Sequence, residues 1–144
     1  MRSDDIPILS LLQQTMRFQS QRQNVVAENV ANANTPGFTP QDVDEADFHR
    51  ALRADLQARQ ASRRAQAGGG ASEVSSTPFV SQLQGRVWDT QDAPNSETTV
   101  NGNSVVVEEQ MIQAQEARMR YETSLSLYQK NLGLLRMAIR SPGR

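Results

Sequence analysis

The chain has 144 residues, of which 37% are hydrophobic and 5% aromatic, and it contains no cysteine. So few apolar side chains can bury only a small core, and the lack of cysteine excludes disulfides and cysteine-based zinc sites. Fifteen lysines and arginines against sixteen acidic residues leave a net charge of −1, which excludes a general electrostatic attraction to nucleic acid or anionic membranes.

Residues 5 to 33 carry apolar groups at alternating steps of three and four, which predicts a long helix with one continuous stripe. Asp4 or Asp5 is expected to cap its start, and Pro7 is tolerated in the first turn, where backbone donors lack intrahelical acceptors. The stripe consists of Leu9, Leu12, Met16, Gln19, Gln23, Val26, Val30 and Ala33.

The N-terminal sequence MRSDDIPILS lacks the uninterrupted apolar segment of a cleavable secretory signal. No stretch of the chain is long and apolar enough to span a bilayer. The residues alone therefore favour a soluble, cytosolic protein.

The sequence NVANANTPGF, residues 29 to 38, ends this helix. Asn32 and Asn34 accept left-handed backbone angles, which predicts a helix stop there. Pro36 and Gly37 suit the two central positions of a type II turn, since proline fixes φ near −65° and glycine supplies a positive φ. Phe38 is thus presented on a stiff turn, where it packs either on its own helices or on another subunit.

Residues 48 to 67 are rich in alanine, arginine and glutamine and predict a second helix, with Phe48, Leu52 and Leu56 on one face. GGG at 68 to 70 ends that helix. The segment from 71 to 100 contains short apolar pieces, PFV and RVW, which form either brief strands or ordered loop.

An acidic cluster precedes the second helix, beside the single histidine, His49. Asp42, Asp44, Glu45 and Asp47 lack the glycine and closing glutamate of an EF-hand, which argues against a metal site. These carboxylates instead favour the positive end of the helix dipole at its first turn. We expect neither a cofactor nor a catalytic site.

The C-terminal segment repeats the helical pattern more strongly, after an Asn-Gly-Asn turn at 101 to 103 and a cap expected from Ser104. Gly133 lies within this helix and is expected to permit close approach of another backbone. The stripe consists of Val107, Met111, Ala114, Arg118, Tyr121, Leu125, Tyr128, Leu132, Leu135 and Ile139.

Both stripes have an average spacing near 3.5 residues, which favours supercoiling of the terminal helices around each other. We therefore predict an all-α fold in which the N- and C-terminal helices pair as a coiled coil around a short irregular middle. The expected segments are residues 1–40, 41–67, 68–103 and 104–144. Because Gln19 and Gln23 interrupt the first stripe, we expect the terminal helices to be frayed until neighbouring subunits cover them.

The stretch NVVAENVANANTPGF resembles the N-terminal signature of bacterial flagellar axial proteins, the rod, hook and hook-associated group. The C-terminal sequence from NGNSV onward also resembles the closing helix of that family. Within the group, the RFQSQRQNVVAENVANANTPGF opening, the QDVD that follows and the NGNSV before the last helix are most similar to proximal rod proteins. The resemblance covers roughly residues 8 to 50 and 101 to 140.

The resemblance implies a non-enzymatic structural subunit of the flagellar basal body. Such a subunit is exported without a cleaved signal through the flagellar type III apparatus and stacks helically in the periplasmic rod. It implies that copies of the chain, other rod subunits and the membrane-ring and export-gate base are its partners, in place of the cytosolic default. The assembly motif it implies comprises Asn29, Asn32, Asn34, Thr35, Pro36, Gly37 and Phe38.

Two alternatives stay open at the level of sequence. The two stripes suit a generic coiled-coil adaptor equally well, although an adaptor has less need of a stiff Pro-Gly turn. The stretch from Arg50 to Arg64 is locally basic and could contact phosphates, through Arg50, Arg53, Arg59, Arg63 and Arg64. Overall neutrality and the absence of interleaved aromatics argue against nucleic acid.

Overall fold

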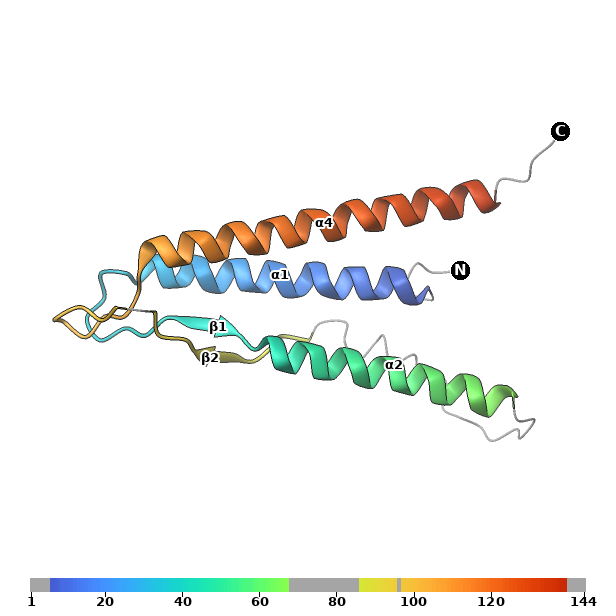
Figure 1. Cartoon of the computed structure of the whole chain (residues 1–144), viewed down its shortest axis with the longest axis horizontal. Helices are drawn as coiled ribbons and strands as arrows, with labels where there is room; N and C mark the ends of the chain where they lie inside the picture. Colours follow the sequence, from blue (N-terminus) through green and yellow to red (C-terminus); the bar gives the residue numbers. More distant parts are fainter. Residues whose placement is uncertain (1–5, 68–85, 96, 140–144) are drawn as a thin grey trace.

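The computed structural model of the chain describes residues 6–67, 86–95 and 97–139. In this part of the chain it places helices α1 (Pro7–Ala31), α2 (Glu45–Ala67) and α4 (Val107–Ile139) and strands β1 (Gln41–Val43) and β2 (Thr90–Asp92). Figure 1 shows two long terminal helices side by side and a short middle with a two-stranded sheet. The predicted helical fold with paired terminal helices is confirmed. The GGG and PFV pieces lie outside the described residues.

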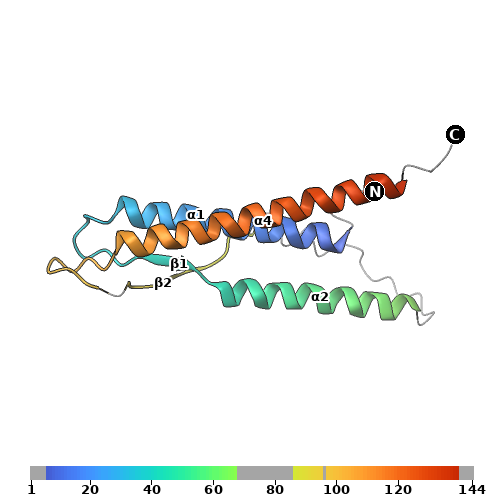
Figure 2. The same ribbon diagram turned by 45° about the horizontal axis from the view of Figure 1, so that its top comes forward.

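Helices α1 and α4 form an antiparallel pair that can be followed in Figures 1 and 2. Near one end, the Asn29 Nδ2 donates to the Gln110 Oε1 at 2.8 Å. Toward the other end, the Gln13 Nε2 donates to the Tyr128 hydroxyl at 3.2 Å. As the residue number rises along α4 it falls along α1, so the start of α1 and the end of α4 lie at the same end of the molecule.

The start of α1 is formed by Pro7, as expected, because a proline loses no hydrogen bond at the first helical position. The preceding residue, Ile6, provides no side-chain cap. Asp4 and Asp5 lie outside the described residues. The Ser10 hydroxyl donates to the Pro7 carbonyl at 2.9 Å within the first turn.

On α4, the residues most deeply buried against the rest of the chain are Gln110, Ala117 and Ser124. They lie seven residues apart, and Ala117 has no exposed surface. Two of these side chains are small, which lets the backbone of α4 approach α1 closely. The heptad periodicity expected for a helix pair is therefore present, but its most buried positions are small or polar.

A second packed region lies on the other side of α1, between α1, β1, α2 and the residue Trp88. The Phe18 and Phe48 rings stack with their centroids 4.5 Å apart, and Trp88 approaches Phe48 edge-on at 5.1 Å. Offset and edge-to-face arrangements are the favourable ones for aromatic rings. This aromatic cluster fastens the middle segment to the centre of α1.

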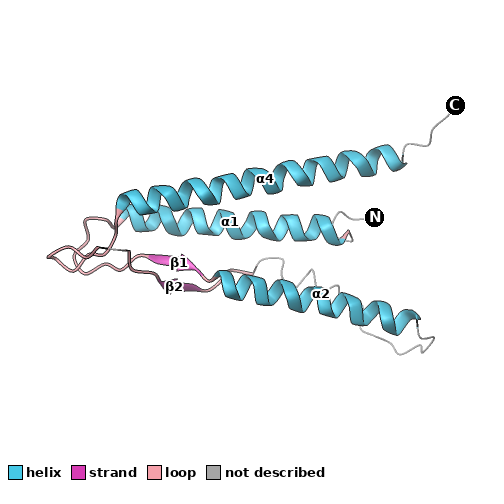
Figure 3. Cartoon of the chain, in the orientation of Figure 1, coloured by secondary structure: helices cyan, strands magenta, loops and turns pink. Residues whose placement is uncertain are grey.

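The sheet is antiparallel, with Gln41 opposite Asp92 and Val43 opposite Thr90 (Figure 3). Beyond its ends, the Asp44 amide donates to the Asp89 carbonyl and the Ala93 amide to the Pro40 carbonyl. In the described part of residues 71–100, which begins at residue 86, the structure places a strand at 90–92, while the RVW piece is not a strand.

Helix α2 starts where the acidic cluster predicts a helix start. The Asp44 Oδ1 accepts hydrogen bonds from the Ala46 and Asp47 amides at 2.8 and 3.1 Å, which caps the helix. Phe48 is buried, Leu52 is half-buried and Leu56 is exposed. The apolar face of α2 is thus covered at its start, and Figure 1 shows the helix running away from α1 beyond that point.

One expectation for the C-terminal helix is wrong, and a second finds no neighbour among the described residues of this chain. Ser104 is not its cap, because α4 begins at Val107 and the Val106 amide donates to the Asn95 Oδ1 instead. Gly133 has no close neighbour, since a Cβ placed on it would meet nothing within 4 Å. The backbone that it was expected to admit is therefore not part of this chain's described residues.

Candidate assembly site where the two terminal motifs meet

The NVANANTPGF stretch begins where α1 ends. Asn32, the residue after Ala31, has φ −96° and ψ 8°, so the expected left-handed angle is wrong at this position. It is wrong at Asn34 as well, because among the described residues only Gly37 and Gly102 have positive φ. The Asn32 Nδ2 instead donates to the Glu28 carbonyl at 2.9 Å, so the side chain pairs with a last-turn carbonyl without backbone strain.

The turn that follows has the form predicted from its sequence. The Phe38 amide donates to the Thr35 carbonyl at 3.3 Å, and Gly37 has φ 71°. The Thr35 hydroxyl donates to the Asn32 Oδ1 at 3.1 Å, which ties the turn to the end of the helix. The direction of the chain after α1 is therefore fixed by local hydrogen bonds.

A second turn lies against the first. Gly102 has φ 81°, and its amide donates to the Thr99 carbonyl at 2.9 Å, as the Asn-Gly-Asn sequence predicts. The Gly37 amide donates to the Asn101 carbonyl at 3.1 Å. A Cβ on Gly102 would lie 3.5 Å from the Gly37 Cα, so the two glycines meet back to back. The N-terminal and C-terminal motifs therefore form one junction.

Asn103 holds this junction together from inside. Its Nδ2 donates to the Asn32 and Thr35 carbonyls at 2.9 and 2.7 Å, and its Oδ1 accepts from the Val105 amide at 2.8 Å. The side chain is buried, and its amide spans both motifs. Sequence reasoning treated Asn103 only as part of a turn, because nothing in its neighbours indicates partners about 70 positions away.

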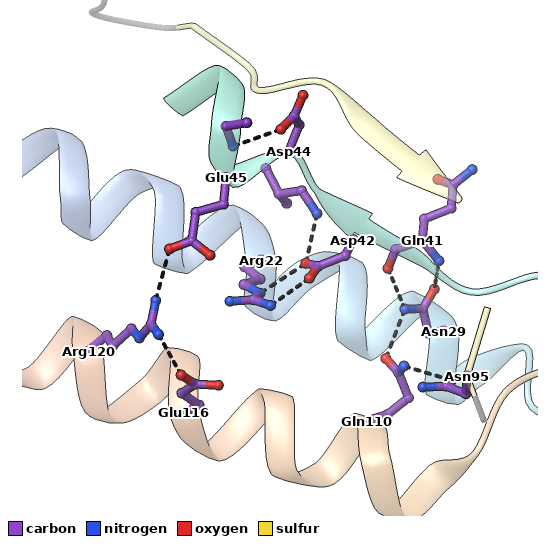
Figure 4. Close-up of polar contacts among 12 residues, drawn as sticks. Arg22, Asn29, Gln41, Asp42, Asp44, Glu45, Asn95, Gln110, Glu116 and Arg120 are labelled. Carbon is purple, nitrogen blue, oxygen red and sulfur yellow. Dashed lines mark hydrogen bonds and ion pairs between the residues drawn. The ribbon is translucent and has the colours of Figure 1, made fainter. Parts of the chain in front are cut away.

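The Asn29 side chain connects α1, β1 and α4 through hydrogen bonds (Figure 4). Its Nδ2 donates to the Gln41 carbonyl at 2.7 Å and to the Gln110 Oε1 at 2.8 Å, and its Oδ1 accepts from the Gln41 amide at 3.0 Å. The side chain thus pairs with the backbone of Gln41 as a neighbouring strand would. The Gln110 Nε2 continues the network to the Asn95 Oδ1 at 3.1 Å.

Ion pairs extend the junction along the helices, as Figure 4 shows. Arg22 of α1 binds Asp42 of β1 through two hydrogen bonds of 2.9 and 2.5 Å, the bidentate geometry that suits a guanidinium and a carboxylate. Arg120 of α4 pairs with Glu45 of α2 at 3.3 Å and with Glu116 of its own helix at 2.6 Å. The pair of Arg120 and Glu45 connects helices whose residues lie 75 positions apart in the sequence.

The structure distributes the seven residues of the assembly motif between the interior and the surface. Asn29 is buried, and Asn32 and Phe38 are half-buried. The remainder are exposed at the tip of the junction: Asn34, Thr35, Pro36 and Gly37. The exposed residues take part in the junction as well, since the Thr35 carbonyl accepts from Asn103 and the Gly37 amide donates to the Asn101 carbonyl.

The predicted stripe residues divide in the same way. On α1, Leu9, Leu12 and Val26 are buried and Met16 and Val30 half-buried. On α4, Met111 and Ile139 are exposed, so α1 does not cover these two predicted positions. Val107 and Arg118 are exposed as well. The remaining α4 positions are half-buried: Ala114, Tyr121, Leu125, Tyr128, Leu132 and Leu135.

The arginines considered for nucleic-acid binding lie on α2. Arg53 and Arg64 are exposed, while Arg50 pairs with Asp47 at 3.4 Å. Asp47 also accepts from Arg86 at 2.7 Å, and Arg86 lies over the Trp88 ring. One of the basic side chains is therefore already engaged by a carboxylate.

Within the described ranges, no group of three or more acidic or histidine side chains is placed to hold a metal ion. The helices described in these ranges are too short or too polar to cross a membrane. What the junction offers chemically is amide hydrogen bonding, tight turns and apolar packing.

Residues 11–39, which include most of α1 and the turn after it, match the model of the family described as flagella basal body rod protein. The chain is 29% identical over 126 residues to the flagellar basal body rod protein FlgB of Escherichia coli (strain K12), with 82% of each chain covered. The FlgB protein of Shigella flexneri gives the same identity and coverage. The chain is therefore similar over most of its length to FlgB flagellar basal body rod proteins, and most of α1 with the turn after it matches the rod-protein family model.

Proposed function

We propose that the chain is a structural subunit of the proximal rod of the bacterial flagellar basal body, which assembles helically to transmit torque. The match to the rod-protein family model and the similarity to FlgB support a structural role. The proximal position is supported by the similarity to FlgB over most of the chain. The partners proposed are copies of the chain, other rod subunits and the membrane-ring and export-gate base, with neither nucleic acid nor a small-molecule substrate.

The observation that carries this proposal is the junction itself. An open helical assembly needs subunits whose contact surfaces keep fixed angles to one another. The back-to-back turns at Gly37 and Gly102, clamped by Asn103, hold the helix pair and the exposed tip as one unit. A generic adaptor that needs only a coiled coil would have no use for such a clamp.

Contact with neighbouring subunits in a rod would also explain why apolar residues of the terminal helices are exposed in the single chain. Met111 and Ile139 of the α4 stripe are largely exposed in the single chain, and neighbouring subunits would remove them from water. We therefore expect the isolated chain to have frayed helix ends that become ordered on assembly. Circular dichroism of the purified monomer tests this, and a fully helical, sharply melting spectrum contradicts it.

The subunit is proposed to reach the periplasm through the type III route of the flagellum without loss of an N-terminal signal. The intact mass of the protein recovered from purified basal bodies measures this. A mass that begins at residue 1 or 2 agrees with the proposal, whereas a mass that lacks a longer N-terminal segment contradicts it.

The test of the assembly role is a charge placed in the α4 stripe. Leu125→Asp or Leu132→Asp is expected to prevent rod formation, since the carboxylate would be desolvated without a partner. Export is expected to continue. Gln129→Asp, on an exposed part of the same helix, is the matched control and is expected to leave rods intact. Normal rods in cells that carry Leu132→Asp would contradict this role of the stripe.

A further inference from the structure

The junction contains the one Asn-Gly pair of the sequence, Asn101 and Gly102. Both residues are exposed at the surface of the second turn, where water reaches them. An asparagine followed by glycine readily loses its side-chain amide, because glycine has no Cβ to keep its nitrogen away from the asparagine side chain. The pair is therefore a candidate site of covalent modification that requires no enzyme.

The reaction has two steps and consumes only water. The Gly102 nitrogen attacks the Asn101 Cγ, a bond forms between them, and the bond from Cγ to Nδ2 breaks. The proton of the Gly102 nitrogen leaves with the amide group as ammonia, which closes a cyclic imide. Water then opens the imide. Opening at Cγ gives aspartate, whereas opening at the main-chain carbonyl carbon gives isoaspartate, in which the chain continues through the side chain.

The folded junction engages both reacting groups in other hydrogen bonds. The Gly102 amide, whose nitrogen must attack, donates to the Thr99 carbonyl at 2.9 Å. The Asn101 Oδ1 accepts from the Asn103 amide at 3.2 Å and from the Thr99 hydroxyl. Attack requires the Gly102 amide to lose its proton and the Asn101 side chain to turn toward it. These hydrogen bonds oppose both changes.

The turn that carries the pair is also fixed from the other motif. The Asn101 carbonyl accepts from the Gly37 amide at 3.1 Å, and the Asn103 Nδ2 donates to the Asn32 and Thr35 carbonyls. Hydrogen bonds to the first motif therefore hold the chain on both sides of Gly102. The reaction must wait for a local opening of the junction, whose population falls as the junction becomes more stable.

We propose that Asn101 is a deamidation site which the closed junction protects, and that its conversion to isoaspartate prevents the junction from closing. Isoaspartate lengthens the main chain before Gly102 by one methylene and turns the Asn101 carbonyl into a carboxylate beside the chain. The acceptor of the Gly37 amide is then displaced. A Cβ on Gly102 would lie only 3.5 Å from the Gly37 Cα, so the two turns have little space in which to adjust.

Aspartate at the same position is expected to be compatible with the junction. It leaves the length of the main chain unchanged and offers an oxygen to the same two donors, the Asn103 amide and the Thr99 hydroxyl. Its charge strengthens hydrogen bonds of this kind. The two products of one reaction therefore have different structural consequences.

This chemistry belongs to the single chain and does not depend on the proposed function. Its consequence is that a chain left unfolded loses the ability to join its two terminal motifs, whereas a folded chain keeps it.

The test of protection compares the full chain with a peptide of residues 97–105 at mildly alkaline pH. Mass spectrometry after digestion measures asparagine, aspartate and isoaspartate at position 101 over time. The peptide is expected to react at least about tenfold faster than the folded chain. Asn103→Ala, which opens the clamp, is expected to bring the rate of the full chain toward that of the peptide. Asn24→Ala, an exposed position outside the junction, is the matched control and is expected to leave the rate unchanged.

Equal rates in the full chain and the peptide would overturn the protection, and a peptide that does not react would overturn the site. Trp88 emission shows whether the aromatic cluster stays folded in the variants. Thr99→Val is a milder variant, because Thr99 is exposed and only its hydroxyl is lost. It is expected to raise the rate about threefold, as loss of one weak hydrogen bond would. An unchanged rate would contradict the role of the Asn101 side-chain contacts.

The effect of isoaspartate is measured on chains aged in guanidinium chloride and then returned to buffer. Limited proteolysis cleaves the chains that fail to close the junction, and isoaspartate at position 101 is expected to be at least fivefold enriched among them. Asn101→Asp is expected to refold with the same urea midpoint as the wild-type chain. Equal resistance of the isoaspartate and aspartate forms to the protease would overturn the second part of the proposal.

Discussion

Asn29 and Gln110 are 81 residues apart in the sequence and share a buried hydrogen bond of 2.8 Å between the two side-chain amides. The same Asn29 side chain also exchanges two hydrogen bonds with the backbone of Gln41. One residue therefore joins the end of α1, the start of α4 and the first strand.

Asn29→Ala is expected to lower the free energy of unfolding by about 3 kcal/mol, because it removes three hydrogen bonds and leaves the buried Gln110 Oε1 without its donor. Urea unfolding followed by the fluorescence of the single tryptophan, Trp88, measures this change. Asn24→Ala, on an exposed position of the same helix, is expected to change it by less than about 0.5 kcal/mol. Equal effects of the two substitutions would mean that the amide network does not stabilise the junction.

The three glycines of the described helices and turns are expected to respond to alanine with opposite signs. Gly37→Ala and Gly102→Ala are expected to destabilise by about 1–2 kcal/mol each, since both residues have positive φ. Gly133→Ala is expected to stabilise by about 0.5–1 kcal/mol, because it lies inside a helix with open space at its Cβ. Thermal unfolding of the three variants measures the signs, and destabilisation by Gly133→Ala would show a close neighbour at that position.

The ion pair between Arg22 and Asp42 is expected to contribute measurably, unlike the exposed pairs of α4. Its side chains are only 12% and 17% exposed, so Arg22→Met is expected to cost about 2 kcal/mol by leaving the carboxylate unpaired. A double-mutant cycle with Asp42→Asn isolates the coupling between the two side chains. The same cycle on Arg118 and Glu122, which are exposed, is expected to give less than about 0.5 kcal/mol.

The apolar face of α2 is expected to matter only near its start. Phe48→Ala is expected to cost about 3–5 kcal/mol, because the ring stacks on Phe18 and meets Trp88 in the aromatic cluster. Leu56→Ala, two turns further on, is expected to cost less than about 0.5 kcal/mol, since that side chain is already exposed. A large loss of stability from Leu56→Ala in the monomer would show that α2 packs further along its length.

The paired terminal helices could be predicted from the sequence because apolar residues recur every three or four positions in each helix separately. The most buried positions of α4 could not be predicted, because apolar side chains lie on several sides of this helix and do not mark a single face. Its most buried positions, Gln110, Ala117 and Ser124, are small or polar and carry no hydrophobic signal. Their spacing of seven residues is the one local sign that could have located them.

The turn at Pro36 and Gly37 was predictable because it depends on the backbone preferences of two adjacent residues. The roles of Asn29, Asn95 and Asn103 were not, because their partners come from segments about 10 to 80 positions away. The cap of α4 shows the same difficulty: Ser104 is the nearest suitable residue in sequence, yet Asn95 approaches from a separate segment. Asparagine suits turns and caps alike, so its type alone does not decide between them.

The central claim is that this FlgB-like chain is a rod subunit, and deletion of its gene followed by electron cryomicroscopy of purified basal bodies tests it most directly. The account predicts that deletion removes the rod and stops swimming, and that the wild-type chain restores both and is found in the rod density. Complete rods in basal bodies from the deletion strain would contradict it.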